Sequence, residues 1–236
     1  MPGNRLSFRT TAVILATLPC GAPGGTGPDG EGTAMQILIV NGSMTPKHYG
    51  TSIARWLADV AARLDKPGVT TRIADLHTLD LPFFDEPELP RLHRYEHDHT
   101  RAWSAIVDAA DAFVFVSPEY NHSYSALLKN ALDYLYDEWN YKPAGLVSYG
   151  AGVSAGLLGA QHLRTVLSAL KMLPIQDSVT IPFIEQHVVS GAFTPNEPLT
   201  LAATTMLSEL VRIGTMFSVL LDAADAQRRT ATLMNL

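Results

Sequence analysis

The stretch best suited to chemistry is residues 117–121 (SPEYN), which lies between a strand pattern and a helix pattern. The apolar run 112–116 before it is typical of a strand buried on both faces of a parallel sheet. From Ser125 onward, apolar residues recur at helical spacing. An extended Pro-Glu-Tyr-Asn segment offers backbone polar groups, an aromatic face and an amide, which suit the edge of a flat heteroaromatic ring. The alternative is a turn with an incidental tyrosine.

A second candidate turn, residues 42–52 (GSMTPKHYGTS), joins a strand pattern to an amphipathic helix pattern. A helix N-terminus carries unpaired N–H groups and a positive dipole end, so it accepts a phosphate. Additional donors in the turn are hydroxyls or positive charges: Ser43, Thr45, Thr51, Ser52, Lys47 and His48. The alternative is that Thr51 or Ser52 caps the helix. No Gly-Lys-Ser/Thr occurs, which excludes a Walker loop.

The third candidate turn, residues 148–156 (SYGAGVSAG), consists of small residues that let a backbone approach a ligand closely. The turn also fits the pattern GxGxxxG after a strand, and Asp177 follows about 20 residues later. Together these features imitate the fingerprint of a Rossmann dinucleotide-binding site. That fingerprint belongs on the first strand of a βαβ unit. Here it follows the fourth strand, so a Rossmann-type dehydrogenase is the weaker alternative.

The elements that must position these turns alternate along the chain. Strand patterns cover residues 35–40, 69–76, 112–116, 144–149 and part of 173–181. Helix patterns cover 51–64, 92–110, 125–138, 154–170 and 199–224, with a long loop at 77–90. Five strand–helix repeats predict an α/β fold, a three-layer flavodoxin-like sandwich with a five-stranded parallel sheet in the order 2-1-3-4-5. The switch point of that sheet lies between strands one and three, which brings the three turns together.

Composition narrows the function classes. The chain has 236 residues, a net charge of −6 and no Lys/Arg run, so a nucleic-acid surface is not expected. The single cysteine, Cys20, excludes an internal disulfide or a cysteine metal cluster. No continuous apolar window of about 18 residues occurs, so we expect no membrane span and a cytoplasmic location.

Two further segments need an interpretation. Residues 1–34 are rich in Gly and Pro toward their end, and we expect a disordered or dispensable extension before one domain at 35–236. A weak secretory signal or an upstream start codon are the alternatives.

His93 and His97, predicted to share a helical face, invite a metal site with His99. The surrounding arginines favour a solvated charged helix face instead, and we expect no metal.

The segment PEYNHSYSALLKNALDYL, residues 118–135, resembles the NAD(P)H-dependent FMN reductases of flavodoxin-like fold, a group that includes quinone, azo and chromate reductases. Their pattern is P-E-Y-N-x-S-x-P-x-x-L-K-N-A-x-D, and Ser125 stands here in place of its second proline. The resemblance covers residues 36–170 well and the last helix loosely.

The resemblance implies an FMN site made of Gly42, Ser43, Thr45, Lys47, His48, Tyr49, Pro118, Glu119, Tyr120, Asn121, Tyr149 and Gly150. Residues 42–49 correspond to the phosphate loop, usually G-S-x-R-x-x-S. Thr45 stands where its Arg belongs and His48 where its second Ser belongs, so Lys47 is the remaining source of charge. Pro118 to Asn121 correspond to the flavin-ring loop, and Tyr149 with Gly150 to the other side of the flavin.

The implied activity is hydride transfer from NADPH or NADH, through bound FMN, to a small electron acceptor such as a quinone, azo or nitro compound. It needs no catalytic side chain if solvent protonates the product. The resemblance also implies a homodimer or homotetramer, with the apolar residues of 126–139 as the interface. Two alternatives stay open, an FMN-binding electron carrier without NAD(P)H activity and a flavin-free scaffold or binding module.

Overall fold

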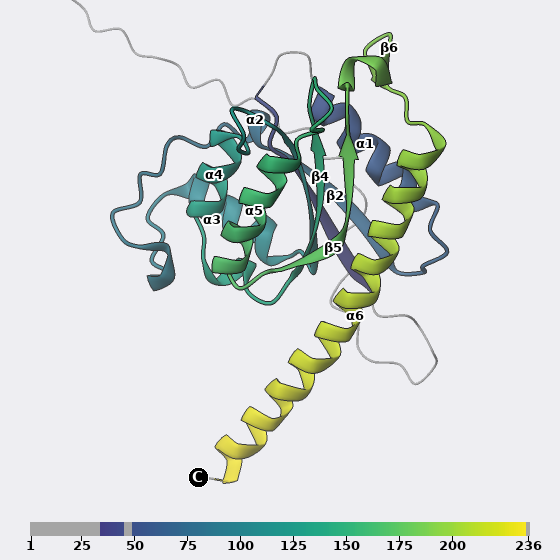
Figure 1. The fold of residues 1–236 in the computed structure, drawn as a ribbon. Helices are drawn as coiled ribbons and strands as arrows, with labels where there is room; N and C mark the ends of the chain where they lie inside the picture. The colour runs from purple at the N-terminus through teal and green to yellow at the C-terminus, as the bar shows by residue number, and fades with distance from the viewer. Residues whose placement is uncertain (1–33, 45–48, 235–236) are drawn as a thin grey trace, which may run out of the picture. The chain divides into compact units, whose positions relative to one another are not determined.

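A computed structural model describes residues 34–44 and 49–234 of the chain, with side chains described as far as residue 220. Its five long strands form one parallel sheet in the order β2-β1-β3-β4-β5 (Figure 1). Their bounds are β1 Met35–Asn41, β2 Val69–Asp75, β3 Ala112–Pro118, β4 Pro143–Tyr149 and β5 Leu173–Ile181. The predicted fold class and strand order are therefore confirmed.

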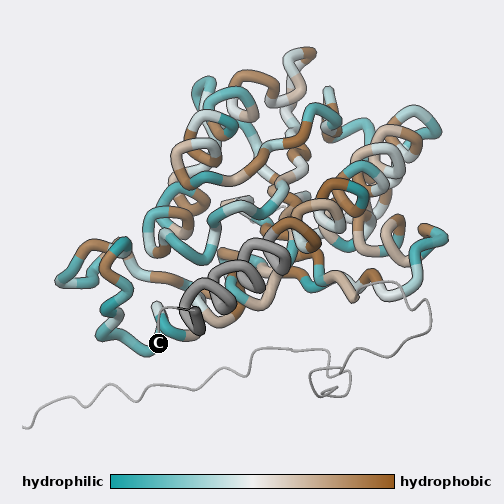
Figure 2. The backbone as a smooth tube through the Cα atoms, turned by 90° about the horizontal axis from the view of Figure 1, so that it is seen from below, coloured by the Kyte–Doolittle hydropathy of each residue, from teal (hydrophilic) through white to brown (hydrophobic). Residues whose placement is uncertain are grey.

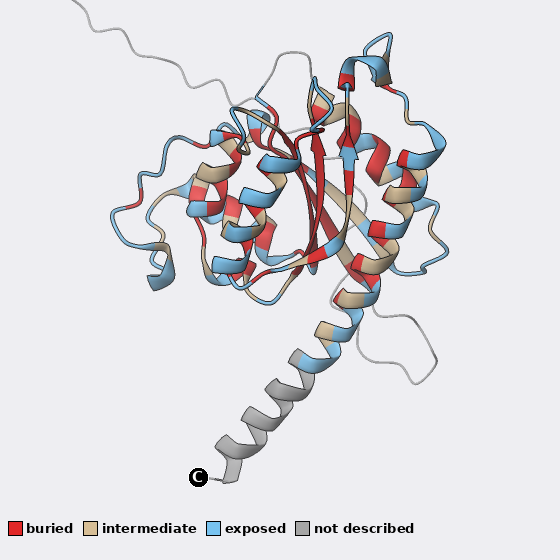
Figure 3. Ribbon diagram, viewed as in Figure 1, coloured by how far each residue is buried: buried red, intermediate tan, exposed pale blue. Residues whose placement is uncertain are grey.

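Helices cover both faces of this sheet (Figure 1). They are α1 Tyr49–Ala62, α2 Leu76–Leu79, α3 Asp98–Asp108, α4 Ala126–Asp133, α5 Leu157–Ala169 and α6 Glu197–Met234. Because side chains alternate along a strand, Ile37 and Ile39 pack with α1 and α6, whereas Leu38 and Val40 pack with α3 and α4. The sheet therefore separates two hydrophobic cores, and the buried residues are concentrated along its central strands β1, β3 and β4 (Figure 3).

The amphipathic helices follow from their residue spacing. In α1, the residues Ile53, Trp56, Leu57 and Val60 recur at three- and four-residue intervals, and all are buried. Figure 2 shows hydrophobic and hydrophilic residues following each other around the helices in the same way. Within the described residues, no helix combines the length and the apolar character needed to cross a membrane.

The predicted helix at 92–110 is wrong in its first part, because α3 begins only at Asp98. Pro90 starts a short 3-10 turn that ends when His93 adopts the left-handed conformation, with φ of 54°. The buried carboxylate of Glu86 then accepts the N–H groups of Glu96 and His97, at 2.8 and 3.1 Å. His97 consequently lies outside the helix in extended backbone. His93 and His97 therefore do not share a helical face.

The predicted helix at 125–138 is also too long, because α4 ends at Asp133 and a 3-10 turn follows at Asp137–Trp139. Glu138 in that turn is buried. Its carboxylate accepts the hydroxyl protons of Ser104 and Tyr95, at 2.6 and 2.9 Å. These tertiary contacts turn the chain inward, where helical periodicity alone would continue it.

The sequence pattern missed a small hairpin after β5. Strands β6 Val188–Val189 and β7 Ala192–Phe193 pair antiparallel across Ser190 and Gly191, which both have positive φ. That is the geometry of a two-residue hairpin turn. Phe193 packs on Trp56 of α1 with ring centroids 5.0 Å apart, and its N–H donates to Ser52 Oγ at 2.6 Å. The strands are too short to show alternation, so only these contacts define them.

Candidate functional site

The three turns singled out in the sequence meet at the carboxyl edge of β1, β3 and β4. The Gly42 N–H donates to the Val116 carbonyl at 2.9 Å, which joins the first turn to the end of β3. The Glu119 N–H donates to the Tyr149 carbonyl at 3.2 Å, which joins the second turn to the third. The switch point of the sheet therefore brings the turns together, as the strand order requires.

Asn41, the last residue of β1, fixes the beginning of the first turn. Its amide nitrogen donates to Asp75 Oδ2 at 3.0 Å and to Thr51 Oγ1 at 3.2 Å. Its amide oxygen accepts the Ser43 N–H at 3.1 Å. A Cβ atom at Gly50 would overlap with that oxygen, so only glycine lets α1 approach so closely. Both ends of the turn are thereby anchored to one side chain.

The hydroxyls of Thr51 and Ser52, candidates for phosphate donors, are engaged in tertiary contacts. Thr51 Oγ1 donates to Asp75 Oδ2 at 2.7 Å, and Ser52 Oγ accepts the Phe193 N–H. They brace α1 against β2 and the hairpin. The proposed phosphate-loop residues Thr45, Lys47 and His48 lie outside the described residues. Gly42, Ser43 and Tyr49 border that segment on either side.

Ser125 connects the first turn to the second. It is fully buried at the N-cap of α4, where its hydroxyl accepts the Leu128 N–H at 3.1 Å and donates to the Gly42 carbonyl at 2.6 Å. A Cβ atom at Gly42 would lie 3.0 Å from Cβ of Leu128, so the close approach of the first turn and α4 favours glycine.

The second turn, the SPEYN stretch, is held as a tight hairpin. Tyr120 and Ser123 exchange backbone hydrogen bonds of 2.8 and 3.0 Å, and Asn121 and His122 between them have positive φ. The Glu119 carboxylate accepts the Gly159 N–H at 3.2 Å, in the first turn of α5. Negative charge is favourable at that helix end. The hairpin therefore presents Asn121, which is exposed, on a fixed backbone.

Two tyrosine hydroxyls are buried where the turns meet. Neither Tyr120 OH nor Tyr149 OH has a hydrogen-bond partner among the described residues. Burial raises the pKa of the Tyr149 phenol. The Ser43 hydroxyl and the Gly50 backbone lie near the phenol without reaching hydrogen-bond geometry, and they lower its pKa by less. Burial likewise raises the pKa of Tyr120. Both phenols are protonated at neutral pH, so they offer donors that a polar ligand can satisfy.

The third turn leaves room for a ligand. The Gly150 N–H donates to the Ile181 carbonyl at 3.2 Å, and Ser148 Oγ donates to the Ala155 carbonyl at 2.9 Å, so the base of the turn is fixed. A Cβ atom at Gly152 would meet no other atom within 4 Å. The backbone at Gly152 is thus open to close approach. Asp177, the acidic residue of the apparent dinucleotide-binding fingerprint, lies within β5. It lines a groove together with Met35 and residues of α6.

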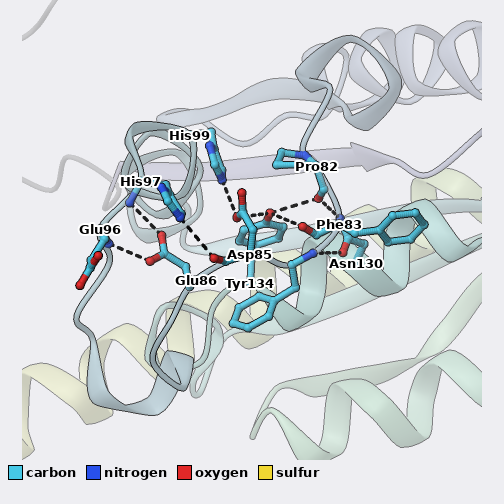
Figure 4. A network of polar contacts seen from close by, with 10 residues as sticks. Pro82, Phe83, Asp85, Glu86, Glu96, His97, His99, Asn130 and Tyr134 are labelled. Atoms are coloured by element: carbon cyan, nitrogen blue, oxygen red, sulfur yellow. Dashed lines mark hydrogen bonds and ion pairs between the residues drawn. The ribbon is translucent and has the colours of Figure 1, made fainter.

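Two of the histidines considered for a metal site contact Asp85 in the loop before α3. His99 Nε2 lies 3.0 Å from Asp85 Oδ1, His97 Nε2 lies 3.2 Å from the Asp85 carbonyl, and the two imidazoles stack at 5.1 Å (Figure 4). Tyr134 OH donates to the same Asp85 carboxylate at 2.9 Å. Over residues 34–44 and 49–234, no group of three or more His, Cys, Asp or Glu is arranged to hold a metal ion. His97 and His99 belong to a network that attaches the loop before α3 to α4. His93 lies apart from it, with Nδ1 3.8 Å from Glu138 Oε1.

Comparison with known proteins agrees with this arrangement. The family model of the NADPH-dependent FMN reductases matches residues 35–186. An NAD(P)H-dependent FMN reductase of Schizosaccharomyces pombe is 37% identical over 192 residues, which are 80% of this chain and 91% of that protein. One of Saccharomyces cerevisiae is 35% identical, over 58% of this chain and 76% of that protein.

A solved structure shares the fold. FerB, a flavoenzyme NAD(P)H:(acceptor) oxidoreductase of Paracoccus denitrificans, superposes with a TM-score of 0.61 and 20% identity, over 78% of this chain and 99% of that one. The fold, the SPEYN hairpin at the switch point and the family match over most of the domain lead to one conclusion. The chain belongs to the NADPH-dependent FMN reductase family, and is accordingly an oxidoreductase with FMN and NAD(P)H as its cofactors.

Proposed function

We propose that the three turns bind FMN and that the enzyme passes hydride equivalents from NAD(P)H to a small quinone, azo or nitro acceptor. The observation that carries this proposal is that the SPEYN hairpin and the third turn each contribute a buried phenol hydroxyl, of Tyr120 and Tyr149, that has no partner among the described residues. The proposed FMN contacts are Gly42, Ser43, Thr45, Lys47, His48, Tyr49, Pro118, Glu119, Tyr120, Asn121, Tyr149 and Gly150.

FMN, when bound, supplies the hydride-accepting and hydride-donating chemistry. The chain binds and orients it. Residues 42–49 and the N-terminus of α1 hold the phosphate. The SPEYN hairpin, fixed through Glu119, holds the edge of the ring. Because the Gly150 N–H is engaged with Ile181, the Ala151 and Gly152 N–H groups are the donors of the third turn that we assign to the other side of the ring.

Two alternatives are less well supported. A Rossmann dehydrogenase would have the strand order 3-2-1-4-5-6 and an acid near its glycine turn, whereas this sheet is 2-1-3-4-5 and Asp177 lies within β5. An electron carrier would bind FMN but would not be reduced by NAD(P)H. The family match favours the reductase over the carrier.

The first test is the colour of the purified protein. We expect flavin absorbance, FMN released on denaturation, and FMN bleaching when NADPH or NADH is added without air. Bleaching separates the reductase from the electron carrier, and comparison of the two nucleotides identifies the preferred reductant. A colourless protein that also fails to take up added FMN contradicts the proposal.

We also propose a homodimer or homotetramer, but through a different surface from the one expected. The structure buries most apolar side chains of residues 126–139, including Leu128, Leu132 and Trp139, in the protein's own core. Large apolar side chains are exposed instead in the loop before α3, at Phe83, Phe84, Leu89 and Leu92. Phe83→Ser should therefore lower the molar mass measured by light scattering, and an unchanged mass would rule out this surface.

A cytoplasmic location is proposed because NAD(P)H, the reductant, is an intracellular coenzyme. Fractionation of cells that express the full chain tests this directly. Recovery of the activity outside the cytoplasmic fraction would support the secretory-signal alternative for residues 1–34.

A further inference from the structure

Phe183, in the turn that follows β5, has a conformation that its own packing does not explain. Its φ and ψ are 46° and 52°, the left-handed region that a bulky side chain rarely adopts. The residue is nonetheless 42% exposed, so burial of the ring does little to offset the strain. Glycine would adopt this backbone without strain.

The backbone around Phe183 is fixed to the third turn of the candidate site. The Ile184 N–H donates to the Gly150 carbonyl at 3.0 Å, and the Phe183 N–H donates to the Gly152 carbonyl at 3.4 Å. The Gln186 N–H closes the turn on the Phe183 carbonyl at 2.8 Å. The strained residue is therefore held directly beside the Gly150–Gly152 backbone.

A second exposed apolar residue lies on the adjoining turn. Val153 follows Gly152 and is 82% exposed. Because the space beside Gly152 is open, Val153 and Phe183 flank a stretch of accessible backbone. Two exposed apolar side chains thus border the part of the site that we assign to the far side of the flavin ring. A strained residue that persists at such a place suggests a role in function.

We propose that Phe183, together with Val153, forms an apolar edge of the acceptor-binding site and selects acceptors that have a planar ring. This inference rests on the proposed function and adds the residues that decide acceptor preference. A planar quinone gains contact with the aromatic ring and the valine, whereas ferricyanide, a charged octahedral complex, gains none. Phe183 needs no part in proton or electron movement. It acts by contact with the acceptor.

The test is Phe183→Gly in the FMN-loaded full chain. The variant should bind menadione about 3- to 10-fold more weakly in its oxidised form, where no reduction occurs, as measured by fluorescence titration. The KM for menadione should rise by the same factor, while the KM for ferricyanide and the affinity for FMN stay unchanged. The thermal midpoint should rise, since glycine removes the backbone strain.

Tyr141→Gly is the matched control. Tyr141 also has a left-handed backbone, with φ of 62°, and is 50% exposed, but it precedes the amino end of β4, away from the turns at the carboxyl ends of the strands. It should gain stability on substitution without any change in menadione binding. Val153→Ser is an independent second variant. Its exposed position makes misfolding no concern, and it should weaken menadione without affecting ferricyanide.

Each outcome is decisive. Unchanged menadione binding in both Phe183→Gly and Val153→Ser overturns this inference alone and leaves the reductase proposal standing. A parallel loss of FMN affinity would identify Phe183 as a cofactor contact and also overturns it. A lower thermal midpoint for Phe183→Gly would show a structural role instead. A wild-type protein that takes up no FMN overturns the inference and the proposed function together.

Discussion

Ser125 Oγ donates a 2.6 Å hydrogen bond to the Gly42 carbonyl, between residues 83 positions apart in the chain. The same oxygen accepts the Leu128 N–H, so one hydroxyl both caps α4 and fixes the first turn. In the reductase pattern that residues 118–135 resemble, proline stands at this position. This chain instead has a hydrogen-bonded serine there, at the junction of its first and second turns.

Ser125→Ala should destabilise the protein by about 1–3 kcal/mol, because it removes a helix cap and leaves the buried Gly42 carbonyl without its partner. FMN affinity should fall with it, since the first turn loses an anchor. Urea denaturation and FMN titration measure the two effects.

Ser125→Pro should lose less stability than Ser125→Ala, because the φ of −69° already suits proline and the unfolded chain becomes less flexible. Equal stability of all three proteins would show that the hydroxyl has no anchoring role.

The sheet, and the meeting of the three turns at its carboxyl end, could be predicted because both depend on local patterns. Runs of branched apolar residues bounded by turns mark buried strands, and β5 lies at the expected residues 173–181. A long loop between β2 and α3 was expected, but its course and the start of α3 could not be predicted. Its course is decided by Glu86, Asp85 and Glu138, whose carboxylates meet partners 10 to 49 residues away. Hydrophobic periodicity carries no information about such contacts. For the same reason the bond between Ser125 and Gly42 had no signal in the sequence.

Acid should release the loop before α3, because Asp85 and Glu86, two of the carboxylates that hold it, have lowered pKa values. Burial raises the pKa of Glu86, but the Thr100 hydroxyl and the N–H groups of Glu96 and His97 lower it more, to below its usual 4.5. A carboxyl with a depressed folded-state pKa stabilises the fold above its unfolded pKa, and that contribution is lost as pH falls through the folded value. The loop should therefore stay protected from hydrogen exchange at neutral pH and lose protection below about pH 4.5.

Glu86→Gln should cause the loop to lose its protection from hydrogen exchange already at neutral pH. The carboxylate accepts two N–H groups, whereas the amide that replaces it has only one oxygen and would turn its NH2 donor toward the second N–H group. Hydrogen exchange of residues 82–97 by mass spectrometry measures this. Glu88→Gln is the matched control, as Glu88 lies in the same loop but is exposed. Loss of protection in both variants, or in neither, would contradict the anchoring role of Glu86.

A chain that starts at Met35 should keep its stability and its FMN. Met35 is the first residue of β1, is buried, and donates its N–H to the Gly68 carbonyl at 3.0 Å. Residues 1–34 add no expected strand or helix, so we propose that they are dispensable. A chain that starts at Ile37 should instead lose about 2–5 kcal/mol, since it lacks the buried Met35 side chain. Precipitation or flavin loss in the Met35 protein would show that the extension belongs to the domain.

Lys47 should supply the charge that this phosphate loop lacks at Thr45. The phosphate of FMN carries about two negative charges, and the dipole of α1 offsets only about half of one. Of the residues 42–52, Lys47 is the one with a permanent positive charge, and His48 gains one only at lower pH. A charge-assisted hydrogen bond contributes about 1.5–3 kcal/mol, or about 10- to 150-fold in affinity. Lys47→Ala should therefore weaken FMN by that factor and leave riboflavin, which has no phosphate, nearly unchanged.

Titration of both flavins into the apoproteins decides the point, with two further variants for comparison. Lys66→Ala removes the same charge beside the groove at α6, away from the turns, and should weaken neither flavin. Thr45→Arg places a bidentate donor where the related reductases have one, and should strengthen FMN but not riboflavin. Equal weakening of FMN and riboflavin by Lys47→Ala would mean that the substitution disturbs the ring site, because a contact confined to the phosphate cannot affect a flavin without one.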